Sequence, residues 1–317
     1  MSVLDEAQRL ARQGKMADAV ALVRRAADAG DGEALFARAN WALFGLHGNR
    51  DPEAARSLLH AAAAQGHLEA SLLQATLLAN GAIGGRDHAA ALTSLQALAP
   101  ASPDAAAQIE LVRNMPDAAD FGTGTGELLS ERPHVRLVRG FLSQAECDYL
   151  IARSERHLRP SFITDPATRR PIPHPTRTSF GMSFGPTLED LAVHHINLRV
   201  AAASGTDVRS GEPLHVLRYA VGQEYRPHLD TLPGVENQRT CTVLLYLNED
   251  YQGGETVFEW LDLRIRGERG DALIFSTLDR DGRPDVSARH AGLPISGGTK
   301  WLATRWIRQA PVDPFAG

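Results

Sequence analysis

The chain has 317 residues, 43% of them hydrophobic and 22% charged, which gives enough length and apolar content for two globular domains with buried cores. Its formal net charge of -5 and its scattered Lys and Arg residues argue against a nucleic-acid-binding protein. Charged residues interrupt the N-terminal stretch, no long apolar run follows, and the two cysteines, Cys147 and Cys241, lie far apart. We therefore expect a cytoplasmic protein with no membrane span and no thiolate metal cluster.

Residues 1–114 are rich in Ala and Leu and almost free of β-branched alternation, which predicts a string of short helices. Positions repeat at an offset of 36 residues, a period typical of helical-hairpin repeats. The glycines among them are expected to take the left-handed conformation that ends the first helix of each hairpin. The repeated positions are Ala19, Ala55 and Ala91; Gly30 and Gly66; Glu33 and Glu69; Ala34 and Ala70; Asp51 and Asp87; and Ala54 and Ala90.

This pattern resembles Sel1-like repeats, which are relatives of the tetratricopeptide repeat, over about residues 15–99. The resemblance implies a repeat domain that recruits a protein partner, packs on the rest of the chain or forms a homodimer contact. We favour the last two because roughly two and a half repeats form only a short groove.

Residues 115–132 contain the Gly, Asp and Pro residues typical of a linker, so the domain boundary is expected there. A strand and then a helix should follow, with Ser143 as the N-cap and Glu146 completing a capping box. Residues 187–205 predict a second helix that ends at Gly205.

The segment from residue 213 onward changes to short apolar runs separated by Gly, Asp and Pro. At least six such runs lack crossover helices between them, which predicts an antiparallel sandwich or jelly roll. The expected second domain spans residues 133–317.

The stretch "RPHLD" places His228 and Asp230 two residues apart at the end of a predicted strand, so both side chains should face the same way. An isolated His-x-Asp is more often an ordinary polar strand end than a metal site. His290, about 60 residues downstream near another predicted strand start, changes that balance. Two histidines and one carboxylate form the facial triad of non-haem Fe(II) oxygenases, although a hydrolytic zinc also accepts three such ligands.

Lys300 opens the last predicted strand and shares one face of it with Leu302, Thr304 and Trp306. A lysine that points into a small barrel needs an anion to justify its burial, and a dicarboxylate cosubstrate would supply one. Tyr219, nine residues before His228, could donate its hydroxyl to the same carboxylate.

Six pieces of sequence in the same order now resemble one family, the 2-oxoglutarate and Fe(II)-dependent dioxygenases, and within it the prolyl 4-hydroxylase-like branch. The resemblance covers about residues 135–309, and the pieces are "VRLVRGFLSQAECDYLI", "RTSFG", "LHVLRYAVGQEYRPHLD", "RTCTVLLYLNEDYQGGETVF", "RGDALIF" and "DGRPDVSARHAGLPISGGTKWLATRWIR". It implies a double-stranded β-helix that carries the catalytic site. Glu259, Trp260 and Arg289 depart from the family pattern.

The resemblance assigns a role to each matching position. It makes His228, Asp230 and His290 the iron ligands, and it makes Lys300, assisted by Tyr219, the partner of the 2-oxoglutarate C5 carboxylate. It also lets Thr242 and Trp306 line the cosubstrate pocket, implies O2 as the oxidant and ascorbate as an optional reductant, and leaves the "GGET" turn a structural role.

The substrate implied by the resemblance is a proline, either in a peptide or protein or as a free or carrier-bound amino acid, and the products are a hydroxylated carbon, succinate and CO2. Residues 161–181, with Arg169, Arg170 and Arg177, are a candidate lid or a solvated surface loop. Arg177 and Thr178 are the substrate-site candidates in it, and residues 231–239 are expected to be a second, flexible wall. The alternatives are a zinc hydrolase with the same ligands and a non-catalytic repeat scaffold.

Overall fold

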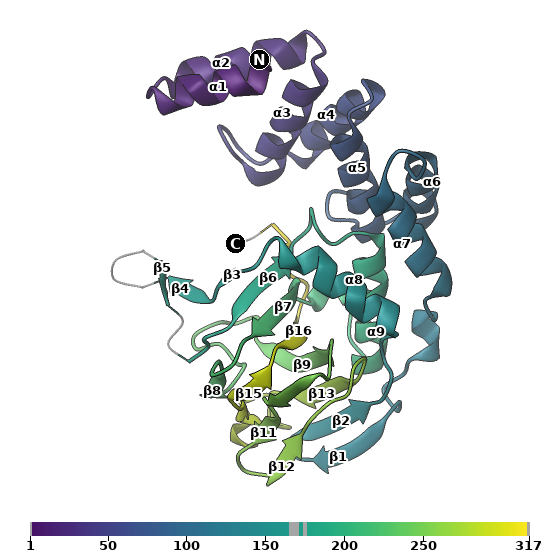
Figure 1. Cartoon of the computed structure of the whole chain (residues 1–317), viewed down its shortest axis with the longest axis vertical. Helices are drawn as coiled ribbons and strands as arrows, with labels where there is room; N and C mark the ends of the chain where they lie inside the picture. The colour runs from purple at the N-terminus through teal and green to yellow at the C-terminus, as the bar shows by residue number, and fades with distance from the viewer. Residues whose placement is uncertain (1, 165–170, 174–175, 316–317) are drawn as a thin grey trace. The chain divides into compact units, whose positions relative to one another are not determined.

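The computed structural model describes residues 2–164, 171–173 and 176–315 (Figure 1). The chain divides into two compact units. A helical unit comprises residues 1–115, 186–194 and 314–317, and a sheet unit comprises residues 116–185 and 195–313. None of the helices in the described part of the chain combines the length and the apolar character that crossing a bilayer requires.

The helical unit is built from consecutive short helices, as the composition predicts. Asp51 and Asp87, one repeat apart, cap two of these helices with the same side-chain acceptor geometry, and Gly30 and Gly66 end helices with φ of 87° and 78°. The helices are α1 (Val3–Arg12), α2 (Met16–Asp28), α3 (Gly32–Phe44), α4 (Pro52–Ala64), α5 (Leu68–Asn80), α6 (His88–Leu98) and α7 (Pro103–Asn114).

The repeated alanines form the tight contacts of this unit. Ala19, Ala55 and Ala91 are buried, as are Ala34 and Ala70, because only a methyl group fits where two helices approach closely. The 36-residue repeat is therefore a repeat of caps and of close contacts. Its assignment to the Sel1-like class stays a prediction.

The sheet unit contains one large and one small antiparallel sheet. The large sheet has the order β1 (Glu127–Glu131), β2 (His134–Val138), β13 (Ala272–Ser276), β9 (Arg239–Tyr246), β16 (Lys300–Arg308), β7 (Leu214–Tyr219), β6 (Phe180–Phe184), β3 (Arg159–Pro160). The small sheet has the order β12 (Leu263–Ile265), β11 (Thr256–Phe258), β14 (His290–Gly292), β8 (Tyr225–His228). Two further pairs join β10 (Tyr251–Gly253) to β15 (Ile295–Gly298) and β4 (Phe162–Thr164) to β5 (Pro171–Pro173).

The core of this unit lies between the two sheets. Leu244, Phe275 and Leu302 come from the large sheet and pack with Phe258 and Ile265 of the small one. Alternate residues of each strand point into this layer, which is why the apolar runs of the sequence alternate.

One part of the expected linker is a strand instead. Within residues 115–132, β1 pairs with β2 at the edge of the large sheet. The strand is largely exposed and half-buried only at Leu129 and Ser130, so it lacks the apolar alternation by which a strand is recognised. An edge strand with one solvated side reads like a loop.

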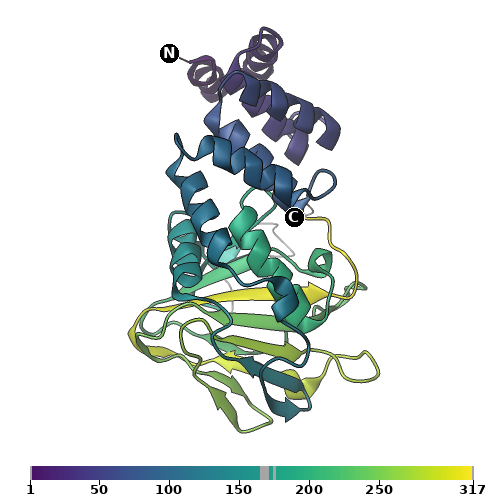
Figure 2. The ribbon, with the colours of Figure 1, turned by 90° about the vertical axis from the view of Figure 1, so that its right-hand side faces the viewer.

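Two helices lie along one face of the large sheet, on the side opposite the small sheet (Figure 2). The first, α8 (Gln144–Glu155), begins with the predicted capping box between Ser143 and Glu146. The second, α9 (Leu191–Ser204), ends before Gly205, whose φ is 69°, as the sequence predicts.

A buried ion pair joins these helices. Arg199 of α9 binds the Glu146 carboxylate of α8, and both side chains are only 1% exposed. Burial lowers the pKa of Arg199, and the neighbouring Glu146 opposes that shift. Glu146 therefore both caps α8 and compensates a buried cation.

We expect Glu146→Leu to reduce the free energy of unfolding by about 3–5 kcal/mol, because Arg199 would keep a buried charge without an anion. Urea denaturation followed by tryptophan fluorescence measures this loss. The matched control is Glu146→Leu with Arg199→Met, which removes both charges and should recover much of the stability. Equal stability of the single and double variants would contradict the assignment.

Candidate metal centre

Two histidines and one aspartate meet at the end of the small sheet. His228 is the last residue of β8, His290 is the first residue of β14, and the two are direct partners across the antiparallel pair. Asp230 lies two residues beyond β8, so it follows the strand rather than belonging to it. The ladder between β8 and β14 thus brings together residues that are far apart in the sequence.

The three side chains converge on a single point. His228 Nε2 lies 3.6 Å from Asp230 Oδ1, and His290 Nε2 lies 3.7 Å from Asp230 Oδ2. One potential ligand atom from each residue falls within a common span of 4.8 Å. Among the described residues, this is the one group of metal-ligating side chains with such geometry.

The tautomers of both histidines are set by the backbone. His228 Nδ1 lies 2.8 Å from the Arg226 carbonyl oxygen, and His290 Nδ1 lies 3.0 Å from the Ala288 carbonyl oxygen. A carbonyl only accepts, so each Nδ1 carries the proton and donates it. Each Nε2 then turns a lone pair toward the common point, as a metal-ligating histidine does.

Asp230 is ionised although it is nearly fully buried. Burial alone would raise the pKa of its carboxyl group, yet the neighbouring His290 and His228 hold that pKa well below its ordinary value. The Thr242 hydroxyl donates to Asp230 Oδ2 at 2.6 Å and acts in the same direction. The carboxylate is thus charged and oriented, and it would attract a cation.

His290 stays neutral at physiological pH. Burial lowers the pKa of His290 to about 4, with His228 acting in the same direction and Asp230 opposing them. A neutral imidazole and an ionised carboxylate are the forms that bind a metal ion. Tyr225 stacks on the His228 ring at 3.5 Å between centroids and fixes its plane.

A cavity surrounds these ligands and extends along one face of β16. The three ligands line it together with Tyr219, Lys300 and Trp306. Leu302 and Thr304 line it as well, so the predicted common face of β16 is confirmed. The cavity therefore joins the histidines to the buried lysine.

Lys300 lines the cavity and is 3% exposed. Its Nζ donates to the Gly254 carbonyl at 2.6 Å and lies 5.3 Å from the centre of the Tyr246 ring. Burial lowers the pKa of Lys300 to about 7, and the nearby Glu255 opposes this shift only in part. Of the 33 basic residues of the chain, 31 are arginine, and the other lysine, Lys15, belongs to the helical unit.

The "GGET" turn lies beside this lysine and is closer to the site than the sequence suggests. Gly254 has φ of 69°, and a β-carbon there would come within 2.3 Å of Ile295 and 3.3 Å of Lys300. Glycine is therefore required both for the turn and for the space next to the ammonium group. Thr256 of the same turn lines the cavity.

Tyr219 is the direct partner of Lys300 across β7 and β16. Burial raises the pKa of Tyr219 to about 12, with Arg177 and a hydrogen bond to Ser179 opposing the shift. The phenol stays protonated and can donate a hydrogen bond next to the ammonium group of Lys300. These two side chains are the pair that the sequence predicts.

The two residues predicted to line the cosubstrate pocket, Trp306 and Thr242, lie in different places. Trp306 lines the cavity with the ligands, and its indole Nε1 is buried without a hydrogen-bond partner. Thr242 is fully buried and touches Asp230 instead of lining the cavity, because it faces the carboxylate from β9. Its contact in the structure is with the carboxylate, which it helps to orient.

Neither substrate-site candidate lines the cavity. Arg177 lies over the ring of Tyr225, with its guanidinium carbon 5.5 Å from the ring centre, and its Nε donates to Ser161 Oγ at 3.1 Å. Thr178 is exposed and exchanges hydrogen bonds with the Glu224 backbone, so it holds the turn before β8. Arg169 and Arg170 of the candidate lid lie outside the described residues.

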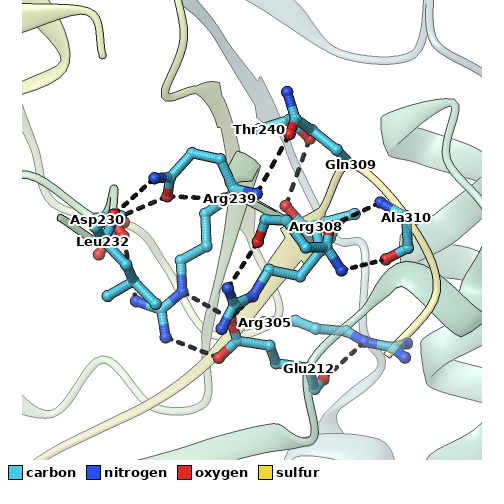
Figure 3. A network of polar contacts seen from close by, with 12 residues as sticks. Glu212, Asp230, Leu232, Arg239, Thr240, Arg305, Arg308, Gln309 and Ala310 are labelled. Atoms are coloured by element: carbon cyan, nitrogen blue, oxygen red, sulfur yellow. Dashed lines mark hydrogen bonds and ion pairs between the residues drawn. The ribbon is translucent and has the colours of Figure 1, made fainter. Parts of the chain in front are cut away.

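The segment after Asp230, which the sequence predicts to be a flexible wall at residues 231–239, is held by side-chain contacts at its two ends (Figure 3). Its flexibility stays a prediction. The Gln238 amide binds both backbone groups of Leu232, and the Arg239 guanidinium binds the Glu212 carboxylate. These contacts join residues that are not neighbours in the sequence, so the local composition of residues 231–239 predicts only a loop. Tyr225 and Glu212 were missed for the same reason, although the "EYRPHLD" spacing places Tyr225 beside His228.

The residues that depart from the family pattern pair with each other beside the site. Arg289 Nε lies 2.6 Å from the Glu259 carboxylate, immediately next to the cross-strand pair of His290 and Phe258. Trp260 is 69% exposed. None of the three is among the described residues that line the cavity.

Residues 214–308 match the family model of the 2OG-Fe(II) oxygenase superfamily. Among solved structures, a viral collagen prolyl hydroxylase from Paramecium Bursaria Chlorella virus-1, in its 2OG complex, is 26% identical. Its TM-score is 0.46, and the match covers 56% of this chain and 96% of that one. A Pseudomonas putida prolyl-4-hydroxylase is 19% identical with a TM-score of 0.42, over 56% of this chain and 92% of that one.

Curated relatives extend the similarity over most of their own length. A probable prolyl 4-hydroxylase 10 of Arabidopsis thaliana is 32% identical over 206 residues, which cover 57% of this chain and 71% of the relative. Prolyl 4-hydroxylase 1 of the same plant is 32% identical over 208 residues, covering 60% and 74%. The chain therefore belongs to the 2OG-Fe(II) oxygenase superfamily and is a 2-oxoglutarate-dependent dioxygenase with prolyl 4-hydroxylase relatives.

Proposed function

We propose that this enzyme hydroxylates a prolyl residue of a peptide or protein, with Fe(II) held by His228, Asp230 and His290. The observation that carries the proposal is the convergence of two Nε2 lone pairs and one ionised carboxylate on a common point. Two nitrogens and one oxygen from one side leave other positions open, which fits the ligand set of non-haem Fe(II) oxygenases.

Lys300 and Tyr219 are the proposed binding partners of the 2-oxoglutarate C5 carboxylate. They are neighbours across β7 and β16, they line the same cavity as the three ligands, and Lys300 is the one Lys or Arg side chain among its described lining residues. A buried ammonium group and a protonated phenol are strong donors to a carboxylate. The other end of the cosubstrate would then point toward the metal ligands.

The finer fold that we propose is a double-stranded β-helix, or jelly roll. It is supported by two antiparallel sheets whose shared apolar layer lies between them and by the absence of crossover helices between β7 and β16 among the described elements. In this arrangement the two histidines lie on the small sheet, Asp230 follows its strand β8, and the lysine lies on the large sheet.

The chain's own contribution to the reaction is positioning and exclusion of water. When bound, iron and 2-oxoglutarate supply the oxidation of C–H to C–OH by O2, with release of succinate and CO2. The backbone carbonyls of Arg226 and Ala288 hold the imidazole protons away from the metal side, and Thr242 holds the carboxylate in place. Apolar side chains such as Leu217 and Ile295 keep the cavity dry.

A prolyl substrate is supported by the names of the relatives, which are prolyl 4-hydroxylases. Zinc hydrolysis and a non-catalytic scaffold, the two alternatives that the sequence leaves open, have no support in that family. The helical unit is proposed to serve as a protein contact or homodimer contact rather than as part of the reaction.

The proposed function predicts succinate formation that requires both Fe(II) and 2-oxoglutarate, and a single oxygen added to a proline-containing peptide. Mass spectrometry of prolyl peptides, free proline and a proline-free peptide, incubated in parallel, separates the substrate classes. His228→Ala should bind no iron and give neither product, with the fold intact by circular dichroism. Hydroxylation of free proline with no reaction on any peptide would reject the peptidyl assignment.

Lys300→Ala should weaken 2-oxoglutarate binding by about 1.5–3 kcal/mol, or roughly 10- to 150-fold, because a hydrogen bond to a charged group is lost. Tyr219→Phe removes a neutral donor and should cost about 0.5–1.5 kcal/mol. Calorimetric titration of the Mn(II)-loaded protein measures both affinities. The metal affinity of each variant is the control, and it should stay unchanged. Wild-type cosubstrate affinity in Lys300→Ala would place the carboxylate elsewhere.

The affinity for 2-oxoglutarate should fall as the pH rises above about 7, because the pKa of Lys300 lies near 7 in the empty site. A bound carboxylate favours the ammonium form and raises that pKa, so binding takes up a proton above about pH 7 and none well below it. Calorimetry in buffers of different ionisation enthalpy measures this uptake at about pH 6 and about pH 9. Lys300→Arg keeps its charge and should show no such dependence.

A further inference from the structure

Asp230 and the two residues after it are held by side chains instead of by a strand. The ladder of β8 ends at His228, and Asp230 already lies outside it. Residues 230–232 lie between β8 and β9 in the chain and belong to neither strand. The position of the carboxylate therefore depends on contacts outside the regular sheet.

Gln238 supplies the contacts that a neighbouring strand would otherwise make. Its Oε1 accepts from the Leu232 backbone N–H at 2.7 Å, and its Nε2 donates to the Leu232 carbonyl at 2.7 Å. One carboxamide thus satisfies both backbone groups of one residue, as an antiparallel partner does. This closes the loop two residues after the ligand.

Arg239 secures the same segment from the next position. Its Nη1 donates to the Asp230 backbone carbonyl at 3.2 Å, while its Nε and Nη2 each bind Glu212 at 2.7 Å. The guanidinium also lies over the Trp306 ring, 4.1 Å from its centre. Arg239, the residue next to Gln238, is therefore itself fixed by a bidentate ion pair and a ring contact.

We propose that Gln238 is a positioning residue for the metal site: its carboxamide fixes the backbone that carries Asp230, so that the carboxylate is oriented before the metal binds. This inference rests on the proposed function, since it takes Asp230 as a metal ligand. Thr242 orients the carboxylate group itself, and Gln238 orients the main chain from which that side chain projects. Contacts of this kind around a ligand tune metal affinity.

Asn237 provides a matched control in the same loop. Its carboxamide makes the same kind of two-point contact, but with Ala310: Nδ2 donates to the Ala310 carbonyl at 3.1 Å, and Oδ1 accepts from its N–H at 2.9 Å. Removing this amide loosens the loop at a residue remote from the ligand segment. A specific role for Gln238 should therefore appear as a difference between the two positions.

The test uses the full-length chain with Mn(II) and Co(II) as probes. Gln238→Ala and Gln238→Met should each raise the dissociation constant for Mn(II) by roughly 10- to 100-fold, whereas Asn237→Ala should change it by less than about twofold. The visible absorption spectrum of bound Co(II), which reports the ligand geometry, should change only in the Gln238 variants. The metal-free variants should unfold at temperatures similar to that of the wild type. If Gln238→Ala is unstable, the positioning role is judged from Gln238→Met, which keeps the side-chain length.

The inference is overturned if the Gln238 variants bind Mn(II) as tightly as the wild type, or if Asn237→Ala weakens binding equally. If the wild type binds Mn(II) and His228→Ala does not, the metal site is established independently of Gln238. If Gln238→Met then binds Mn(II) with the wild-type dissociation constant, the positioning role is rejected and the proposed function still holds.

Discussion

Three electron-pair donors that face one another without a proton between them are the constraint on which the site depends. The Nε2 atoms of His228 and His290 and the carboxylate of Asp230 all turn lone pairs to one point, and both ring protons are engaged by carbonyls on the other side. In a buried environment such a set favours a cation at that point. The surrounding architecture keeps these three donors close together.

Each of the two sheets supplies a different set of site residues. The small sheet supplies the histidines through one cross-strand pair, and the large sheet supplies Lys300, Tyr219 and the hydroxyl that steadies Asp230. The apolar layer between the sheets fixes how far these two sets lie from each other, because packed side chains resist compression. The depth of the cavity is thus a property of the core.

Much of the fold was predictable from local signals. The capping box at Ser143, the helix end at Gly205 and the alternating strands each leave a short pattern that depends on neighbouring residues only. Strand β1 left no such pattern, because an edge strand with polar side chains on its solvated side has the composition of a linker. The ligand set was recognisable because His228 and Asp230 are two residues apart in the sequence and the spacing of His290 and Lys300 matches a family. The ligand roles themselves stay proposals.

The supporting residues were less accessible to sequence reasoning. The contact of Thr242 with Asp230 and the brace from Gln238 to Leu232 depend on how a loop closes against β9, which composition does not encode. Arg177 was suggested by a motif match, and the structure sets its guanidinium 5.5 Å from the ring centre of Tyr225; its role at the substrate site stays a prediction. Local patterns reveal which groups are chemically able to act, and tertiary pairing decides which of them meet.

The direct pairing of His228 with His290 also makes the site sensitive to strand alignment. Neighbouring residues on a strand point to opposite faces, so a slip of one residue would set Ala291 opposite His228 and turn the His290 ring away from Asp230. All three donors coincide in a single alignment of β8 and β14. Metal-binding capacity is consequently a sensitive reporter of correctly aligned strands, including in variants whose overall secondary structure looks unchanged.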